Sequence, residues 1–264
     1  MTASSMTASI MMAEGEITAM STRPRVESGI TGLDKMLSGG FLSGTANLVR
    51  GAPGTGKTVL GLQYLLHGVE RGEPGLLISF EEFPQALQND AQELGWDLRP
   101  WQERGLLHLY FTSPQVLLKS LESPTGPLSE LFIEKNIKRV VLDSVTHFTR
   151  LTNDQQQLRG IYNRLLNALK REGTTALLLA EEGRTEVQRV ERGALSFVVD
   201  TIVLMRYVEV ESAIQRAIAV VKMRGSDHVK EIRRYEIRQG GIVVTGPFEN
   251  RESILTGISH RVSR

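Results

Sequence analysis

One eight-residue stretch, GAPGTGKT at residues 51–58, constrains the fold of this chain more than any other. It matches G-x-x-x-x-G-K-[ST], follows a short apolar segment at 46–49, and precedes apolar residues that recur at helical spacing. A glycine-rich turn between a strand and a helix lets backbone N–H groups surround phosphate oxygens, and the helix N-terminus adds its positive dipole. Chance gives on the order of 0.01 such matches in a chain of this size. The sequence therefore predicts a loop that binds nucleotide phosphates.

The residue types within this loop suggest individual roles. Lys57 is placed to reach the β- and γ-phosphates, and the Thr58 hydroxyl to hold Mg²⁺. Asp143 ends a later apolar segment, and in phosphate-loop proteins a carboxylate at such a position supports Mg²⁺. The remaining predicted nucleotide-binding residues of the loop are Pro53, Gly54, Thr55 and Gly56.

Two adjacent carboxylates, Glu81 and Glu82, directly follow the apolar run at 75–80. Ligands of open α/β sheets bind outside the carboxyl ends of the strands, so either carboxylate could polarise the water that attacks the γ-phosphate, and Glu81 is also a candidate metal ligand. Both residues could instead cap a helix that begins near Pro84. Position alone leaves these two interpretations open.

Apolar segments of strand length alternate with helical patterns over the first two-thirds of the folded chain, which predicts an α/β fold with a mostly parallel central sheet flanked by helices. From Thr201 the pattern changes to β-rich segments, with Gly240-Gly241 as a hairpin signal, so we expect a C-terminal antiparallel β-meander. Residues 113–127 contain three prolines and are predicted to form a broken or mobile connection. Residues 1–24 are predicted to be a disordered extension, and residues 25–264 a single domain.

Composition excludes several classes of function. A formal charge of +1, from 31 basic and 30 acidic residues, does not support binding of nucleic acid through bulk charge. The absence of cysteine excludes disulfides, Cys-ligated metal centres and a Cys nucleophile, and five scattered histidines disfavour a zinc enzyme. No apolar run approaches the ~20 residues of a membrane span, and no secretory signal is present, so we expect a cytoplasmic protein with no membrane partner.

At this point the sequence resembles the KaiC group of RecA-like phosphate-loop ATPases. The resemblance covers Val26 to the C-terminus, and its most specific element is KMRGSDH at residues 222–228. The other matching segments are GITGLDKMLSGG before the phosphate loop, GAPGTGKT, SFEEFPQ, GWDL at 95–98 and RVVLDS.

The resemblance implies a RecA-like domain that forms homohexameric rings with ATP and Mg²⁺ between neighbouring subunits. It implies that Glu81 and Glu82 are the catalytic pair, with Lys57 and Arg224 also catalytic. Residues predicted to contact the neighbour's ATP are Arg216, Lys222, Met223, Arg224, Ser226 and His228. From spacing alone, residues 222–228 would be interpreted as a charged β-turn on a solvated face.

The resemblance is strongest to the second KaiC domain, through DTIVLMRYVEV and KMRGSDHVKEIRRYEI, although this chain carries one such domain. The Ser-Thr phosphorylation pair of that domain falls on Ser196-Phe197, so half of the pair is missing and Ser/Thr autokinase activity is the weaker expectation. We expect a Mg²⁺-dependent ATPase with a regulatory or signalling role and a regulatory protein partner. The alternative is a RecA/RadA-type DNA-binding recombination ATPase, which the neutral charge and missing zinc ribbon disfavour.

Overall fold

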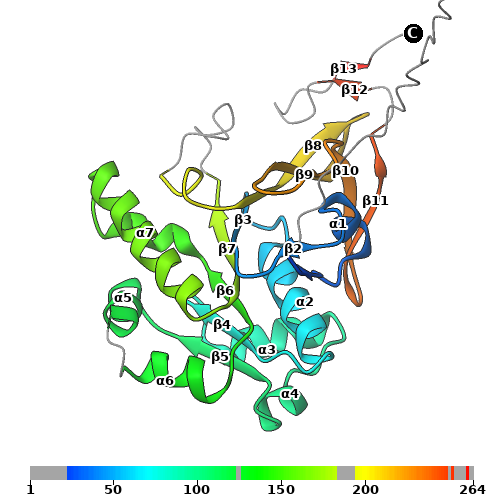
Figure 1. Ribbon diagram of the computed structural model, residues 1–264. Coiled ribbons are helices and arrows are strands. Elements are labelled where there is room, and N and C mark those ends of the chain that lie inside the picture. Colours follow the sequence, from blue (N-terminus) through cyan, green and yellow to red (C-terminus); the bar gives the residue numbers. More distant parts are fainter. Residues whose placement is uncertain (1–22, 123–125, 183–193, 249–250, 253–259, 262–264) are drawn as a thin grey trace, which may run out of the picture.

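The computed structural model describes residues 23–122, 126–182, 194–248, 251–252 and 260–261, so most of the predicted extension at 1–24 lies outside the described residues (Figure 1). The helices are α1 (Thr31–Met36), α2 (Lys57–Val69), α3 (Pro84–Glu93), α4 (Arg99–Glu103), α5 (Pro114–Glu122), α6 (Pro127–Glu134), α7 (Gln155–Arg171) and the 3₁₀-helix η1 (Val145–Arg150). The strands are β1 (Arg25–Val26), β2 (Phe41–Leu42), β3 (Ala46–Gly51), β4 (Gly75–Ser79), β5 (Leu107–Phe111), β6 (Arg139–Asp143), β7 (Thr175–Glu181), β8 (Thr201–Val210), β9 (Ala213–Met223), β10 (Arg233–Arg238), β11 (Gly241–Pro247), β12 (Arg251–Glu252) and β13 (His260–Arg261).

A nine-stranded sheet with the order β11-β10-β9-β8-β3-β7-β6-β4-β5 organises the described part of the chain. The six strands from β8 to β5 pair in parallel, whereas β8, β9, β10 and β11 pair with one another antiparallel. The predicted α/β class, parallel sheet and C-terminal antiparallel meander are therefore confirmed. The hairpin between β10 and β11 turns at Gln239 and Gly240, one residue before the predicted Gly240-Gly241, because Gly241 already belongs to β11.

Successive residues of the central strands feed two separate apolar cores, because side chains alternate between the faces of a sheet. On β3, Val49 belongs to the core beneath α2, whereas Leu48 belongs to the core beneath α7. Figure 1 shows α1 and α2 on one side of the sheet and α5, α6 and α7 on the other. Both faces are covered, so the open edge of the fold that remains for a ligand is the row of carboxyl ends of the parallel strands.

The prediction of a broken or mobile connection at residues 113–127 was wrong for the residues that the structure describes there, and residues 123–125 lie outside the described residues. Residues 114–122 form α5, which begins with Pro114, and α6 begins with Pro127. Proline is well tolerated in the first turn of a helix, where its missing N–H has no intrahelical partner. Leu117 and Leu121 are buried at helical spacing, so Pro114 begins a packed helix and does not interrupt the chain. None of the described helices is long and apolar enough to cross a membrane.

Candidate functional site

The predicted phosphate loop connects the end of β3 to the start of α2. Gly54 and Gly56 have φ of 78° and 91°, in the left-handed region that favours glycine. A Cβ on Gly56 would lie 2.5 Å from Ile237 Cδ1, so the Ile237 side chain also leaves no room for a larger residue at position 56. Pro53 and Gly54 are exposed at the crest of the loop, and Thr55 is buried beneath it. The backbone is thus held in the open curve that a phosphate requires.

Lys57 lies across the mouth of this loop. Its Nζ donates to the carbonyl oxygens of Gly51 at 3.0 Å and Ala52 at 3.1 Å. Burial lowers the pKa of Lys57, partly offset by the negative charges of Glu181 and Asp143. The ammonium group therefore sits in a desolvated place where an anion would be bound strongly.

Thr58 and Asp143 meet beside the loop. The Thr58 hydroxyl donates to Asp143 Oδ2 at 2.7 Å, and burial raises the pKa of Asp143. A hydroxyl and a carboxylate are hard oxygen ligands, which suit Mg²⁺ held partly through water. This pair fits the predicted metal site, although the described residues contain no cluster of three or more His, Asp or Glu side chains that could hold a metal alone.

Glu81 and Glu82 lie at the carboxyl end of β4, whose Ser79 is in register with Asp143 on β6. Their backbone N–H groups donate to the Ser79 hydroxyl, and both side chains are exposed. Helix α3 has Phe83 as its N-cap, with no side-chain cap hydrogen bond, so the geometry does not show the helix-capping pair. The chain has brought both carboxylates to the end of the sheet that carries Lys57.

The two carboxylates differ in surroundings. Glu81 Oε2 lies 3.3 Å from His147 Nε2. The pKa of Glu82 is raised by partial burial first, and then by the charges of Asp143, Asp90 and Glu81. A carboxylate with a raised pKa is a better proton acceptor near neutral pH, so Glu82 is suited to act as a base.

The structure places residues 222–228 at the amino ends of the parallel strands, opposite to the carboxyl ends that carry the phosphate loop. Lys222 is in register with Ile202, which pairs with Leu48 on β3. Gly51 lies three residues further along β3, so Lys222 is about 10 Å back along the strands and two strand spacings, about 10 Å, to the side. Arg224 is further back still, because its backbone N–H donates to the carbonyl of Asp200.

Side chains of this segment contact their own chain. Lys222 Nζ donates to the carbonyls of Ser196 at 2.7 Å and Val199 at 2.8 Å, and Arg224 Nη2 donates to that of Phe197 at 2.7 Å. The remaining members are Met223, which is buried, His228, which is half-buried, and Ser226, whose hydroxyl accepts from Arg25 at 2.6 Å.

Arg216, which the resemblance groups with Lys222, lies apart from it. The two residues are six positions apart on β9, which is about 20 Å in a strand. The Arg216 guanidinium lies 5.6 Å from the centre of the Tyr207 ring, and a Cβ on Gly54 would lie 2.8 Å from the Tyr207 hydroxyl. Arg216 therefore stands beside the phosphate loop of its own chain.

Sequence reasoning missed two supports of the phosphate loop. Tyr235 on β10 donates its hydroxyl to the Thr55 carbonyl at 2.5 Å. Glu182, directly after β7, forms a buried two-contact ion pair with Arg206 on β8, and its N–H donates to the Gly51 carbonyl. No signal in the sequence pairs these residues, because the sheet order alone brings β7, β8 and β10 to the loop.

Ser196, which falls on the phosphorylation pair of the family, is buried, and its hydroxyl lies 3.4 Å from Arg50 Nη2.

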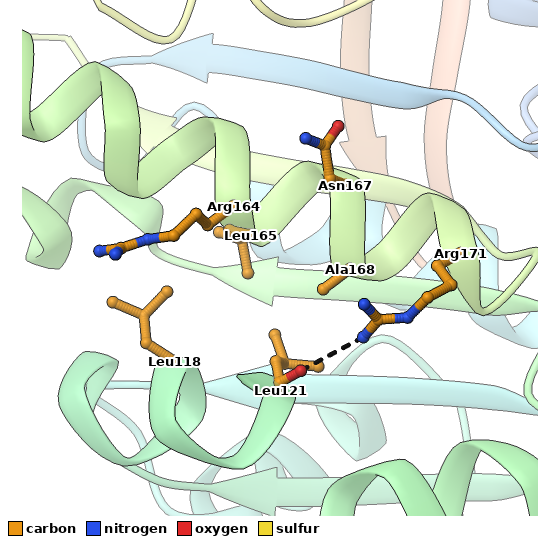
Figure 2. A pocket seen from close by; sticks show the side chains of 7 residues that line it. All are labelled: Leu118, Leu121, Arg164, Leu165, Asn167, Ala168 and Arg171. Carbon is orange, nitrogen blue, oxygen red and sulfur yellow. Dashed lines mark hydrogen bonds between the residues drawn. The ribbon is translucent and has the colours of Figure 1, made fainter. Parts of the chain in front are cut away.

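A separate groove of about 310 Å³ lies between α5 and α7 (Figure 2). Arg171 donates there to the Leu121 carbonyl. No predicted site residue lines this groove, so the candidate site remains the carboxyl ends of β3, β4 and β6.

The fold and this site define a phosphate-loop nucleotide-binding protein of the RecA-like α/β type. The family model for the KaiC ATPase matches residues 26–249, and the chain belongs to the KaiC family of ATPases. This match favours the KaiC assignment over the recombination alternative.

Relatives agree with this assignment. The circadian clock oscillator protein KaiC of Picosynechococcus sp. is 33% identical over 250 residues, which cover 94% of this chain and 48% of the relative. The circadian clock protein KaiC3 of Synechocystis sp. is 33% identical over 228 residues, 83% of this chain and 45% of the relative. The chain thus spans about half the length of these clock relatives. The UPF0273 protein PH0284 of Pyrococcus horikoshii is 32% identical over 237 residues, 83% of this chain and 93% of the relative.

Proposed function

We propose that the chain binds ATP and Mg²⁺ at residues 51–58 and hydrolyses the γ-phosphate bond within a head-to-tail homo-oligomeric ring. The resemblance implies six subunits. The names of the clock relatives favour a regulatory role, and we propose that the chain exerts it in the cytoplasm through a protein partner.

The residues of one chain supply most of the chemistry. Lys57 would neutralise phosphate charge as it grows in the transition state, and Thr58 and Asp143 would hold Mg²⁺. Bound Mg²⁺ adds a fixed positive charge at the phosphates. Glu82 would accept a proton from the attacking water, with Glu81 beside it against His147. Because the Ser196 hydroxyl is buried, we propose water rather than this serine as the phosphoryl acceptor.

One observation carries the ring assignment: Lys222 and Arg224 lie at the opposite end of the parallel strands from Lys57. Neither side chain is long enough to span the strands and meet the nucleotide of its own chain. In a heterologous ring, one end of each subunit faces the other end of the next. Arg224 would then approach the γ-phosphate bound by the neighbouring copy, where an arginine can add about 10³-fold to the rate.

The test mixes two inactive variants, Glu81→Gln/Glu82→Gln and Arg224→Ala, after dissociation and reassembly. Random mixing makes about a quarter of the interfaces complete, because each lesion affects only one side of an interface. We expect ATPase activity to return to about that fraction. Mixing Glu81→Gln/Glu82→Gln with Lys57→Ala is the matched control, since both lesions lie on the same side and no interface is restored. Mixed rings that form and stay inactive would show that Arg224 does not act on a neighbour.

A further inference from the structure

An exposed aromatic pair lies beside the proposed catalytic carboxylates. Phe83 is 64% exposed and directly follows Glu82, and Phe111 is 39% exposed at the end of the edge strand β5. Their ring centroids are 4.2 Å apart, at an interplanar angle of 33°. Large aromatic side chains that gather on a surface mark interaction sites, because their burial releases water from apolar area.

A third exposed aromatic ring lies at the other end of the sheet. Phe197 is 51% exposed. It lies in the turn before β8, and this turn is held to the first residue of β3 because the Asp200 N–H donates to the Ala46 carbonyl. The Phe197 carbonyl accepts a hydrogen bond from Arg224, and the Arg159 guanidinium lies 5.3 Å from the centre of its ring. This aromatic ring is thus flanked by two cations.

The two aromatic sites belong to opposite ends of the parallel strands and cannot meet within one chain. A ring that brings Arg224 to the neighbour's γ-phosphate also brings Phe197, because the two residues are hydrogen-bonded. That γ-phosphate would lie beside Glu81 and Glu82, and Phe83 is the next residue in the sequence. The flanking charges are complementary as well, with cations beside Phe197 and carboxylates beside Phe83.

We propose that Phe197 of each copy packs against the Phe83–Phe111 pair of the next copy, so that the occupant of this aromatic surface is a second copy of the chain. The inference rests on the head-to-tail ring of the proposed function and adds the contact that fixes its register. It also gives a role to the residue that stands where the resemblance places a phosphorylation site. An aromatic side chain there stabilises the interface by packing.

The absence of cysteine from the chain allows a direct test by disulfide formation. The variants Phe83→Cys and Phe197→Cys are mixed, assembled with Mg-ATP and oxidised. A disulfide needs Cα atoms about 4.4–6.8 Å apart, so it forms only where the two positions meet. We expect one covalent dimer that contains one chain of each variant. The double variant Phe83→Cys/Phe197→Cys should give a ladder of linked chains that ends at the number of subunits in the ring.

The control pairs Phe197→Cys with Ile133→Cys, because Ile133 is 69% exposed on α6 and lies outside the proposed contact. Light scattering on the same samples separates the two levels of failure. If rings form but the Phe83 pair is cross-linked no more than the Ile133 pair, the aromatic contact is overturned while the shared active site stands. If the chain stays monomeric with Mg-ATP, both proposals are overturned.

Substitutions by alanine give an independent measurement. Phe197→Ala should raise the chain concentration at half-assembly at least tenfold, whereas Ile133→Ala should leave it unchanged. Because Phe83 and Phe197 would lose the same contact, the effect of the double variant should fall well short of the product of the two single effects. Fully multiplicative effects would overturn the contact.

Discussion

Removing the Tyr235 hydroxyl from the antiparallel strands β8–β11 is expected to weaken ATP binding, although this hydroxyl is not among the groups proposed to contact phosphate. Tyr235 on β10 is buried and donates to the Thr55 carbonyl at the base of the phosphate loop. Tyr235→Phe leaves that carbonyl without its donor, and a buried acceptor left unsatisfied costs about 1–3 kcal/mol. The variant should therefore unfold more easily by about that free energy.

Part of this cost should fall on nucleotide binding. Pro53 and Gly54 are exposed at the crest of the loop, so the loop of the variant can shift until water reaches the Thr55 carbonyl. Bound ATP would hold the loop in its original curve and prevent that relief. If about 1 kcal/mol of relief is lost on binding, the Kd for ATP rises about fivefold.

The assay is calorimetric titration with a slowly hydrolysed ATP analogue, alongside urea unfolding. Tyr64→Phe is the matched control, because it removes another buried hydroxyl, which donates to the Thr175 carbonyl at 2.9 Å at the far end of the sheet. Both variants should lose stability, and only Tyr235→Phe should lose affinity. Equal affinities in the two variants would refute the idea that β10 supports the phosphate loop.

Further outcomes follow from the other site residues and from one buried carboxyl. Lys57→Ala removes the cation at the mouth of the loop, and calorimetric titration should show at least a tenfold loss of ATP affinity. Glu81→Gln/Glu82→Gln should keep ATP binding and lower phosphate release about 10²-fold or more, and unaltered turnover would place the base elsewhere. Burial raises the pKa of Asp34, so the native state holds that proton more tightly than the unfolded chain, and stability should fall as pH rises above about 4. Asp34→Asn should reduce this fall in urea unfolding, whereas Asp97→Asn should not, because Arg99 lowers the pKa of Asp97.

The part of the site that the sequence could predict is local in the chain. The phosphate loop is one contiguous segment, and its glycines, Lys57 and Thr58 have roles that their spacing explains. Asp143 ends one apolar strand and the pair Glu81-Glu82 closely follows another, so a parallel sheet had to bring them to one edge. The structure places these residues together, with Thr58 and Asp143 in direct contact.

The supports of the loop could not be predicted because their partners are distant in the chain. Tyr235 contacts Thr55, which lies 180 residues earlier in the chain. Arg206 and Glu182 meet because β8 and β7 flank the same strand, β3, in the sheet. Such contacts depend on strand order, which the apolar pattern of each strand does not encode. The helix at 114–122 was missed for a different reason: its single proline, Pro114, was interpreted as a break, although it occupies the first turn.

Lys222 and Arg224, the two cations of the segment at 222–228, have different roles in the proposed ring, and the hydrogen bonds that they donate indicate which. A lysine ammonium has three N–H donors, and Lys222 directs it at two carbonyls of the turn that holds Ser196 and Val199. A guanidinium has five donors in a planar fork, and the Arg224 side chain is exposed while it bonds the Phe197 carbonyl. A planar fork can keep that bond and present its other edge to a phosphate oxygen, and the exposed Arg224 is more accessible to such an oxygen than the half-buried Lys222, whose ammonium donates to two carbonyls. In the proposed ring, Arg224 is therefore the cation that meets the neighbour's phosphate, and Lys222 shapes the turn that carries Phe197 to the interface.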